Sequence, residues 1–142
     1  MKAHRPSLQD DEGGIAALEF VLMFPFLLMV LFGIIDVSLI LCDKAVITNA
    51  SREAARAGVM LRTTPWSSPQ IQAVALNYTQ NNLVTGGTPT AASALASYTS
   101  QTSGSPLTVT VTYTYQGLVL GSIFSAIAGP VTIKAVTVMN YE

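Results

Sequence analysis

The chain has 142 residues, of which half are hydrophobic and only 11% are charged, and its formal net charge is −1. Soluble domains usually carry about 25% charged residues, so this composition indicates a membrane or assembly protein. The net charge gives no electrostatic footprint for nucleic acid. With one cysteine, Cys42, and one histidine, His4, the chain cannot form an intramolecular disulfide or a zinc site of the usual kind.

Residues 1–14 form a short polar leader. It begins with Lys2 and Arg5 and continues into an acidic cluster formed by Asp10, Asp11 and Glu12. A polar terminal segment of this kind is typical of a disordered tail. The apolar run behind it is longer than the core of a cleaved secretory signal, and no A-x-A site follows it. A retained anchor is therefore favoured over an ordinary signal peptide.

Residues 15–42 are almost wholly apolar and predict a membrane-spanning helix. Such a helix needs about 20 residues, and the stretch from Phe20 to Ile35 carries no charge. Glu19 and Asp36 would lie near the two edges of the membrane, where a charge costs less than at the centre. The core helix of a soluble protein is the alternative, but the rest of this chain is too short to bury such a helix on all sides.

The helix is expected to continue beyond the membrane, so that one helix covers residues 15–62. No strong breaker precedes Gly58 in residues 43–62. Small residues recur there at spacings of three and four, which places candidates for close helix packing on one face: Ala50, Ala54, Ala57 and Gly58. A helix of this length is not stable alone, so its outer half should pack against a domain and its inner half against lipid or sister helices.

The charges that flank the predicted span favour an amino terminus outside the cytoplasm. Only Lys2 and Arg5 precede the span. Four basic residues follow it within 20 positions: Lys44, Arg52, Arg56 and Arg62. Because positive residues concentrate on the cytoplasmic side of a span, this count opposes the orientation implied by the motif described below.

Residues 63–142 predict a small α+β domain. Ser67 or Ser68 can cap a second helix, with Pro69 in its first turn, and this helix should end near residue 82. Trp66, just before it, is expected to be a packing residue. The helix carries one amphipathic stripe: Ile71, Val74, Ala75 and Tyr78.

Two strands are predicted in the second half of the chain. Residues 107–115 alternate strictly between threonines and apolar residues, as in a half-buried strand, and residues 131–139 predict a partner strand. Together they predict an antiparallel hairpin or small sheet. Residues 85–106 predict a loop with a short helical piece around residues 91–98. The apolar connection at residues 117–129 is either ordinary core or a surface for a partner or the membrane. One face of the second strand holds three residues: Val131, Ile133 and Ala135.

No set of residues supports enzyme chemistry. His4 stands alone in the leader, and Glu53 and Glu142 have no paired carboxylate. The sequence has no phosphate-binding loop, no C-x-x-C motif and no basic patch with interleaved aromatics. We therefore expect no catalytic site, no metal and no cofactor, and a protein that is a substrate of enzymes rather than an enzyme.

The segment GIAALEF, residues 14–20, resembles the processing site of type IV prepilin-like proteins, G-x-x-x-x-E-[FY]. The resemblance implies that a prepilin peptidase cuts after Gly14 on the cytoplasmic side and frees the amine of Ile15. Glu19 lies one helical turn from that amine, where a carboxylate also suits the helix dipole, and Phe20 completes the motif. The resemblance further implies that Glu19 meets the amino terminus of a neighbouring subunit.

A longer stretch, residues 13–60, is similar to the TadE-like family of the tight-adherence (Flp/Tad) pilus system. The similarity rests on the E-F pair, the Pro25 region, Phe32–Asp36 and the segment ASREAAR. Major Flp pilins are much shorter, so the resemblance implies a minor pilin or pseudopilin. The acidic residues before the cleavage site depart from the basic leader one would expect.

The same resemblance implies a location and partners. The protein would lie in the bacterial inner membrane as a single-pass protein, with a cytoplasmic amino terminus and an extracytoplasmic carboxy-terminal domain, or be incorporated in the pilus at the cell surface. Its partners would be a prepilin peptidase, other pilins and assembly-platform proteins. The long helix would form homo- or hetero-oligomers within membrane lipid.

Two other interpretations stay open from the sequence. The chain could be an uncleaved single-pass anchor that presents a small binding domain unrelated to pili. It could also be a secreted domain behind an unusual signal, in which case a soluble form would begin near residue 43.

Overall fold

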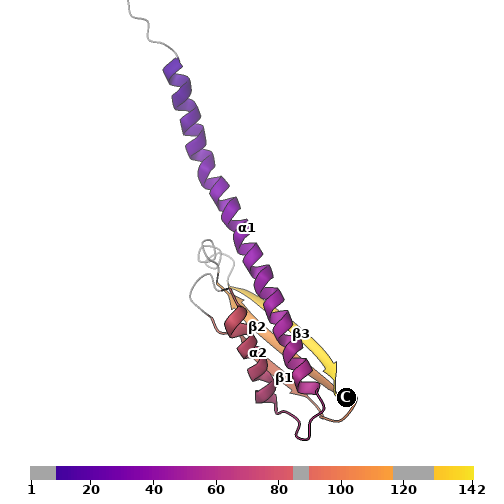
Figure 1. Cartoon of the computed structure of the whole chain (residues 1–142). Helices are drawn as coiled ribbons and strands as arrows, with labels where there is room; N and C mark the ends of the chain where they lie inside the picture. Colours follow the sequence, from indigo (N-terminus) through magenta and orange to yellow (C-terminus); the bar gives the residue numbers. More distant parts are fainter. Residues whose placement is uncertain (1–8, 85–89, 117–129) are drawn as a thin grey trace, which may run out of the picture. The chain divides into compact units, whose positions relative to one another are not determined.

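The computed structural model describes residues 9–84, 90–116 and 130–142. Two helices and three strands follow one another along the chain (Figure 1): α1 Gln9–Val59, α2 Ser68–Asn82, β1 Ser93–Tyr98, β2 Pro106–Tyr115 and β3 Val131–Asn140. The chain divides into two compact units, Met1–Ile35 and Asp36–Glu142. The architecture is α+β, as predicted, and we refer to the second unit as the domain.

Helix α1 has 51 residues and remains helical through Pro25. Membrane helices tolerate an internal proline because other groups can satisfy the backbone that it frees. The helix begins at Gln9, six residues before the predicted start, so the last residues of the leader are helical rather than disordered. Residues 1–8 of that predicted tail lie outside the described residues. The helix ends at Val59, three residues before the predicted end.

Helix α2 begins and ends where the sequence predicted. Ser67 is its N-cap residue, and the Gln70 side chain accepts a hydrogen bond of 2.9 Å from the Ser67 backbone N–H. This bond satisfies one of the donors that a helix start leaves unpaired. The most deeply buried positions of the helix follow at intervals of four: Ile71, Ala75 and Thr79. The predicted Val74 and Tyr78 flank this stripe and are half-buried.

The three strands form one antiparallel sheet in the order β1-β2-β3. The alternation of β2 is resolved as predicted, because its apolar side chains are buried and its threonines point to the other face. In β3, Ala135 is buried and Ile133 half-buried, whereas Val131, on the same face, is 45% exposed at the strand start. The sheet therefore has one covered face and one open face.

The short helical piece predicted around residues 91–98 is wrong, since Ser93–Tyr98 is strand β1. The small residues of this segment have neither a strong helical stripe nor a strong alternation. Pairing decides its conformation: β1 lies antiparallel to β2, with Ala96 opposite Val109. Ser68 of α2 also donates a hydrogen bond of 2.6 Å to the Ala96 carbonyl. The predicted loop thus supplies the third strand.

The core of the domain lies between the covered face of the sheet and the helices. From β2 it contains the fully buried Leu107, Val109 and Val111, which meet Ile47 of α1 and Ile71 of α2. In Figure 1, α2 and the carboxy-terminal part of α1 lie against the sheet. A domain this small needs both helices to cover its sheet, because one layer cannot bury an apolar face alone.

Helix side chains also bond to both outer strands. Ser68 contacts β1 as described, and the Lys44 ammonium of α1 donates to the backbone carbonyl of Lys134 on β3. The hydroxyls of Ser51 on α1 and Thr137 on β3 lie 2.7 Å apart. Side chains that bind edge strands reduce the chance that another chain pairs with them.

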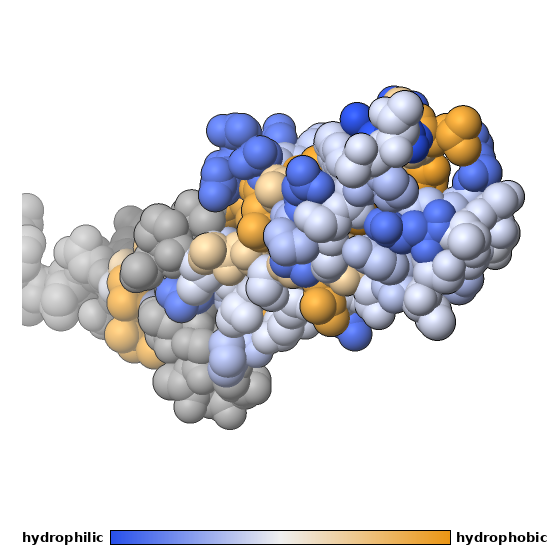
Figure 2. Space-filling model, turned by 90° about the horizontal axis from the view of Figure 1, so that it is seen from below, coloured by the Kyte–Doolittle hydropathy of each residue, from blue (hydrophilic) through white to orange (hydrophobic). Residues whose placement is uncertain are grey.

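The face of the domain seen in Figure 2 is mostly polar. Figure 2 shows apolar side chains as separate spots among polar ones. Trp66, predicted as a packing residue, is half-buried beside the core, and the Arg62 guanidinium lies 4.0 Å from the centre of its ring. The predicted apolar connection at residues 117–129 lies outside the described residues.

Candidate membrane anchor and processing site

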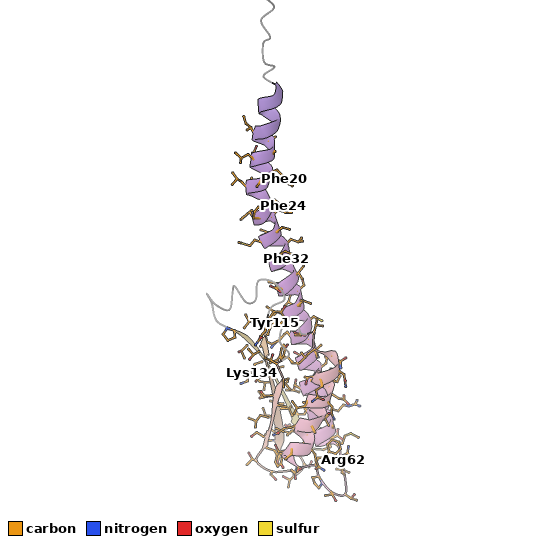
Figure 3. All side chains as sticks on the ribbon, turned by 90° about the vertical axis from the view of Figure 1, so that its left-hand side faces the viewer. Phe20, Phe24, Phe32, Arg62, Tyr115 and Lys134 are labelled. Carbon is orange, nitrogen blue, oxygen red and sulfur yellow. The ribbon has the colours of Figure 1, made fainter. Side chains whose placement is uncertain are left out.

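The first functional feature is the apolar part of α1 from Gly14 to Ile35. Most of its large side chains are exposed, as Leu22 at 71% and Phe26 at 65% illustrate. The side chains of Phe20 and Phe24 project from this part of the helix in Figure 3, and their ring centres are 5.5 Å apart. Apolar surface of this extent is costly in water and favourable in lipid.

The predicted processing residues all lie on this stretch. Gly14, Ile15, Glu19 and Phe20 are helical and exposed. A Cβ added at Gly14 would meet nothing within 4 Å. Among the described residues, no hydrogen bond or ion pair involves the Glu19 side chain. The motif is thus accessible, and its carboxylate is available to a group from outside the chain.

The small residues of the packing stripe lie farther along α1, inside the domain. Ala50 and Ala54 are fully buried, Gly58 is buried and Ala57 is half-buried. The Gly58 position is so close to Leu107 of β2 that a Cβ there would lie 2.6 Å from its Cδ2 atom. These residues therefore pack α1 against the chain's own sheet and α2.

Two aspartates of α1 form polar contacts that were not predicted from the sequence. The phenolic hydroxyl of Tyr115 donates to Asp36 Oδ1 at 3.3 Å. Asp43 is fully buried, and its Oδ1 accepts a hydrogen bond of 2.8 Å from the Val84 backbone N–H. Its Oδ2 has no hydrogen-bond partner in the described part of the chain. Asp36 and Asp43 are seven positions apart, which places both on one helix face. This spacing is a sequence signal for polar contacts on that face.

Burial changes the acidity of the tyrosines next to these aspartates. It raises the pKa of Tyr115 to about 12, and the negative charge of Asp36 adds to the effect. Burial also raises the pKa of Tyr113, where a hydrogen bond with the Thr90 side chain acts in the opposite direction. Both phenols are therefore neutral over the physiological range.

The described residues contain no group of three or more His, Cys, Asp or Glu side chains that could hold a metal ion. A cavity of about 370 Å³ lies between α2 and the chain just before β1. Its lining is mostly apolar or small and contains no titratable side chain: Leu76, Thr79, Gln80, Leu83, Thr90, Ala91 and Ala92. Among the described residues, the candidate functional features are thus the apolar helix and the polar contacts of Asp36 and Asp43.

Fold and site define a class of protein: a small α+β domain that follows one helix long and apolar enough to cross a membrane, the only such helix in the described ranges. The helix fits a single-pass membrane protein.

The family model for TadE-like proteins matches residues 14–56, which confirms the resemblance predicted from the sequence. The match begins at Gly14 and covers both the exposed and the buried parts of α1. Comparisons with curated proteins and with solved structures gave no match.

Proposed function

We propose that this protein is a minor pilin or pseudopilin of a Flp/Tad-type pilus, processed by a prepilin peptidase after Gly14 and assembled through α1. The observation that carries the proposal is Glu19, an exposed carboxylate without a partner among the described residues, five positions after Gly14 on an exposed apolar helix. The family match, which begins at the same glycine, supports it.

The chemistry of Glu19 favours an intermolecular role. A charge inside a membrane costs several kcal/mol unless it is paired or near the edge. Cleavage after Gly14 would create a positively charged amine on Ile15, which is four positions from Glu19 on the helix. The same amine on a neighbouring subunit would neutralise Glu19 and hold the two helices in register. The peptidase would recognise an accessible segment, and a glycine at its cut site weakens the helix there.

In this proposal the leader is cytoplasmic, and the domain lies outside the inner membrane or on the pilus. The protein would contribute to pilus biogenesis, adhesion or secretion as a structural component. Because the flanking basic residues count against this orientation, a reporter fused after Tyr141 gives a direct test. We expect the reporter to be active on the outer side, and activity in the cytoplasm would refute the orientation.

Mass spectrometry of the mature protein tests processing. In cells that contain the prepilin peptidase we expect the amino terminus at Ile15, and in cells without it at Met1. A terminus at Met1 in both strains would contradict processing and favour the uncleaved anchor. A terminus beyond Ile35 would also contradict it and, if near residue 43, would favour a secreted domain.

Substitution of Glu19 tests assembly separately. Glu19→Ala should leave the protein in the membrane but abolish its cross-linking to other pilins, because the amine of the neighbour loses its partner. Glu53→Ala is a matched control, since Glu53 is an exposed carboxylate on the same helix whose ion pair with Arg56 is long, at 3.9 Å. Normal cross-linking of Glu19→Ala would refute the proposed role.

A further inference from the structure

Helix α1 changes its surroundings at Asp36. Up to Ile35 it belongs to the first unit, and from Asp36 onward it belongs to the domain. Leu39 and Ile40 pack against the hydrophobic core, and Asp43 is fully buried. The sequence predicted a span over residues 15–42, yet the last turns of that span already have one face on the domain.

The opposite face of the same turns remains apolar and exposed. Val37 is 56% exposed and Leu41 is 65% exposed, and Ser38 and Cys42 beside them are exposed as well. Between positions 37 and 42 this face carries no charged residue. A stretch with one face on protein and one apolar face open is suited to the boundary between lipid and water.

The lengths agree with this assignment. Residues 14–35 form 22 helical positions, or about 33 Å at about 1.5 Å per residue, which matches a hydrocarbon core of about 30 Å. Residues 36–42 add seven positions, or about 10 Å. The headgroup regions extend a bilayer from about 30 Å to about 40–45 Å, which leaves several ångströms on each side. Residues 36–42 therefore begin within the headgroup layer, and Cys42 at their end lies near the outer edge of that layer.

One end of the sheet lies beside these turns. The Tyr115 hydroxyl bonds to Asp36, and Tyr115 pairs with Val131 across β2 and β3. Val131 is 45% exposed. In Figure 3, Tyr115 and Arg62 lie at opposite ends of the domain. A bilayer edge at Asp36 would bring the Tyr115 end, and not the Arg62 end, to the membrane.

We propose that Asp36–Cys42 and the sheet end at Tyr115 and Val131 form a surface that lies in the phospholipid headgroup layer. Val37 and Leu41 lie beyond Asp36, on the exposed apolar face within the headgroup layer. Asp36 lies just outside the hydrocarbon, where the Tyr115 hydroxyl satisfies one of its oxygens. The assignment depends on membrane insertion of α1, and it holds with or without processing or pilus assembly.

Depth-dependent quenching tests the assignment. The full chain is labelled at its one cysteine, Cys42, with a small fluorophore and reconstituted in phosphatidylcholine–phosphatidylglycerol vesicles. We expect a nitroxide on the lipid headgroup to quench the label more strongly than a nitroxide deep in the acyl chain. Stronger quenching by the deep nitroxide would place Cys42 in the hydrocarbon and overturn the assignment.

Two further positions extend the test, each in a Cys42→Ser background. A label on Val131→Cys should also be quenched by the headgroup nitroxide. A label on Leu61→Cys is the matched control, because Leu61 is 83% exposed and adjoins Arg62 at the other end of the domain. It should respond only to iodide in the water. If Cys42 or Val131→Cys is quenched by iodide alone, or by no quencher because another subunit covers it, the proposed lipid surface is refuted.

Discussion

Gly58 packs closely against the core of the domain, and adding one methyl group there tests how tightly α1 is held. In Gly58→Ala the new Cβ would lie 2.6 Å from Leu107 Cδ2 and 2.9 Å from Ile71 Cδ1. Real Cβ atoms almost never approach a neighbour this closely. Leu107 and Ile71 are themselves fully buried, so neither can move into solvent. The substitution must therefore push α1 away from the sheet or force both side chains out of their preferred rotamers.

The expected cost follows from two opposing effects. Overpacking a well-packed core costs about 1–3 kcal/mol. Alanine is a better helix former than glycine by up to about 1 kcal/mol, but Gly58 is the last residue but one of α1, where this gain is smaller. We expect Gly58→Ala to lower the free energy of unfolding by about 1–2 kcal/mol, and Tm by at least about 4 °C.

Urea unfolding of the full chain in detergent micelles measures this change, with near-ultraviolet circular dichroism reporting the tertiary packing of the domain. Gly33→Ala is the matched control, because a Cβ at Gly33 meets nothing within 4 Å and the residue lies in the first unit. In a Leu107→Ala background, Gly58→Ala should cost much less because its main clash is gone. A Gly58→Ala protein as stable as the wild type would refute the packing argument.

Two further predictions concern the polar contacts of α1. Asp43→Ala leaves the Val84 N–H without its acceptor and should lower the free energy of unfolding by about 1–3 kcal/mol. Asp43→Asn keeps that acceptor and removes a buried charge, so its free energy of unfolding, measured with urea, should be close to that of the wild type. If both variants lost the same free energy of unfolding, the proposed role of the hydrogen bond would be contradicted. Tyr115 has a pKa of about 12 in the folded protein against 10.0 as its ordinary value. Its contribution to stability, about 2–3 kcal/mol, should be complete below pH 10 and lost as the pH rises towards 12. In Tyr115→Phe the free energy of unfolding should change much less with pH over this range. If its pH dependence were the same as in the wild type, the raised pKa of Tyr115 would be refuted.

Several elements follow from residue patterns that need no knowledge of the rest of the chain. The uncharged run from Phe20 to Ile35 is too long and too apolar for anything but a helix in lipid or a deep core. The strict alternation of β2 and the capping serine (Ser67 or Ser68) before Pro69 of α2 are equally local signals. Each depends on spacing along the chain. The structure reproduces α2 and β2 within a residue or two, whereas α1 contains the whole uncharged run but begins six residues before the predicted start and ends three before the predicted end.

Other features depend on which segments meet, and the sequence does not contain that information in any local window. Ser93–Tyr98 has no strong period of its own and is a strand because β2 offers it a partner. The spacing of Ala50, Ala54 and Gly58 identifies a packing face but not its partner. The structure shows that this partner is the chain's own core, including Leu107 of β2.

The membrane anchor combines both kinds of information. The order of residues along the chain alone predicted a long apolar helix with Glu19 close to its start. Only the tertiary structure decided where the domain begins to cover that helix, because hydropathy is the same on both sides of Asp36. The packing of Leu39 and Ile40, the Tyr115–Asp36 hydrogen bond and the burial of Asp43 mark the change. They bring together residues far apart in the sequence, 79 positions for Tyr115 and Asp36 and 41 for Asp43 and Val84, which no hydropathy window can relate.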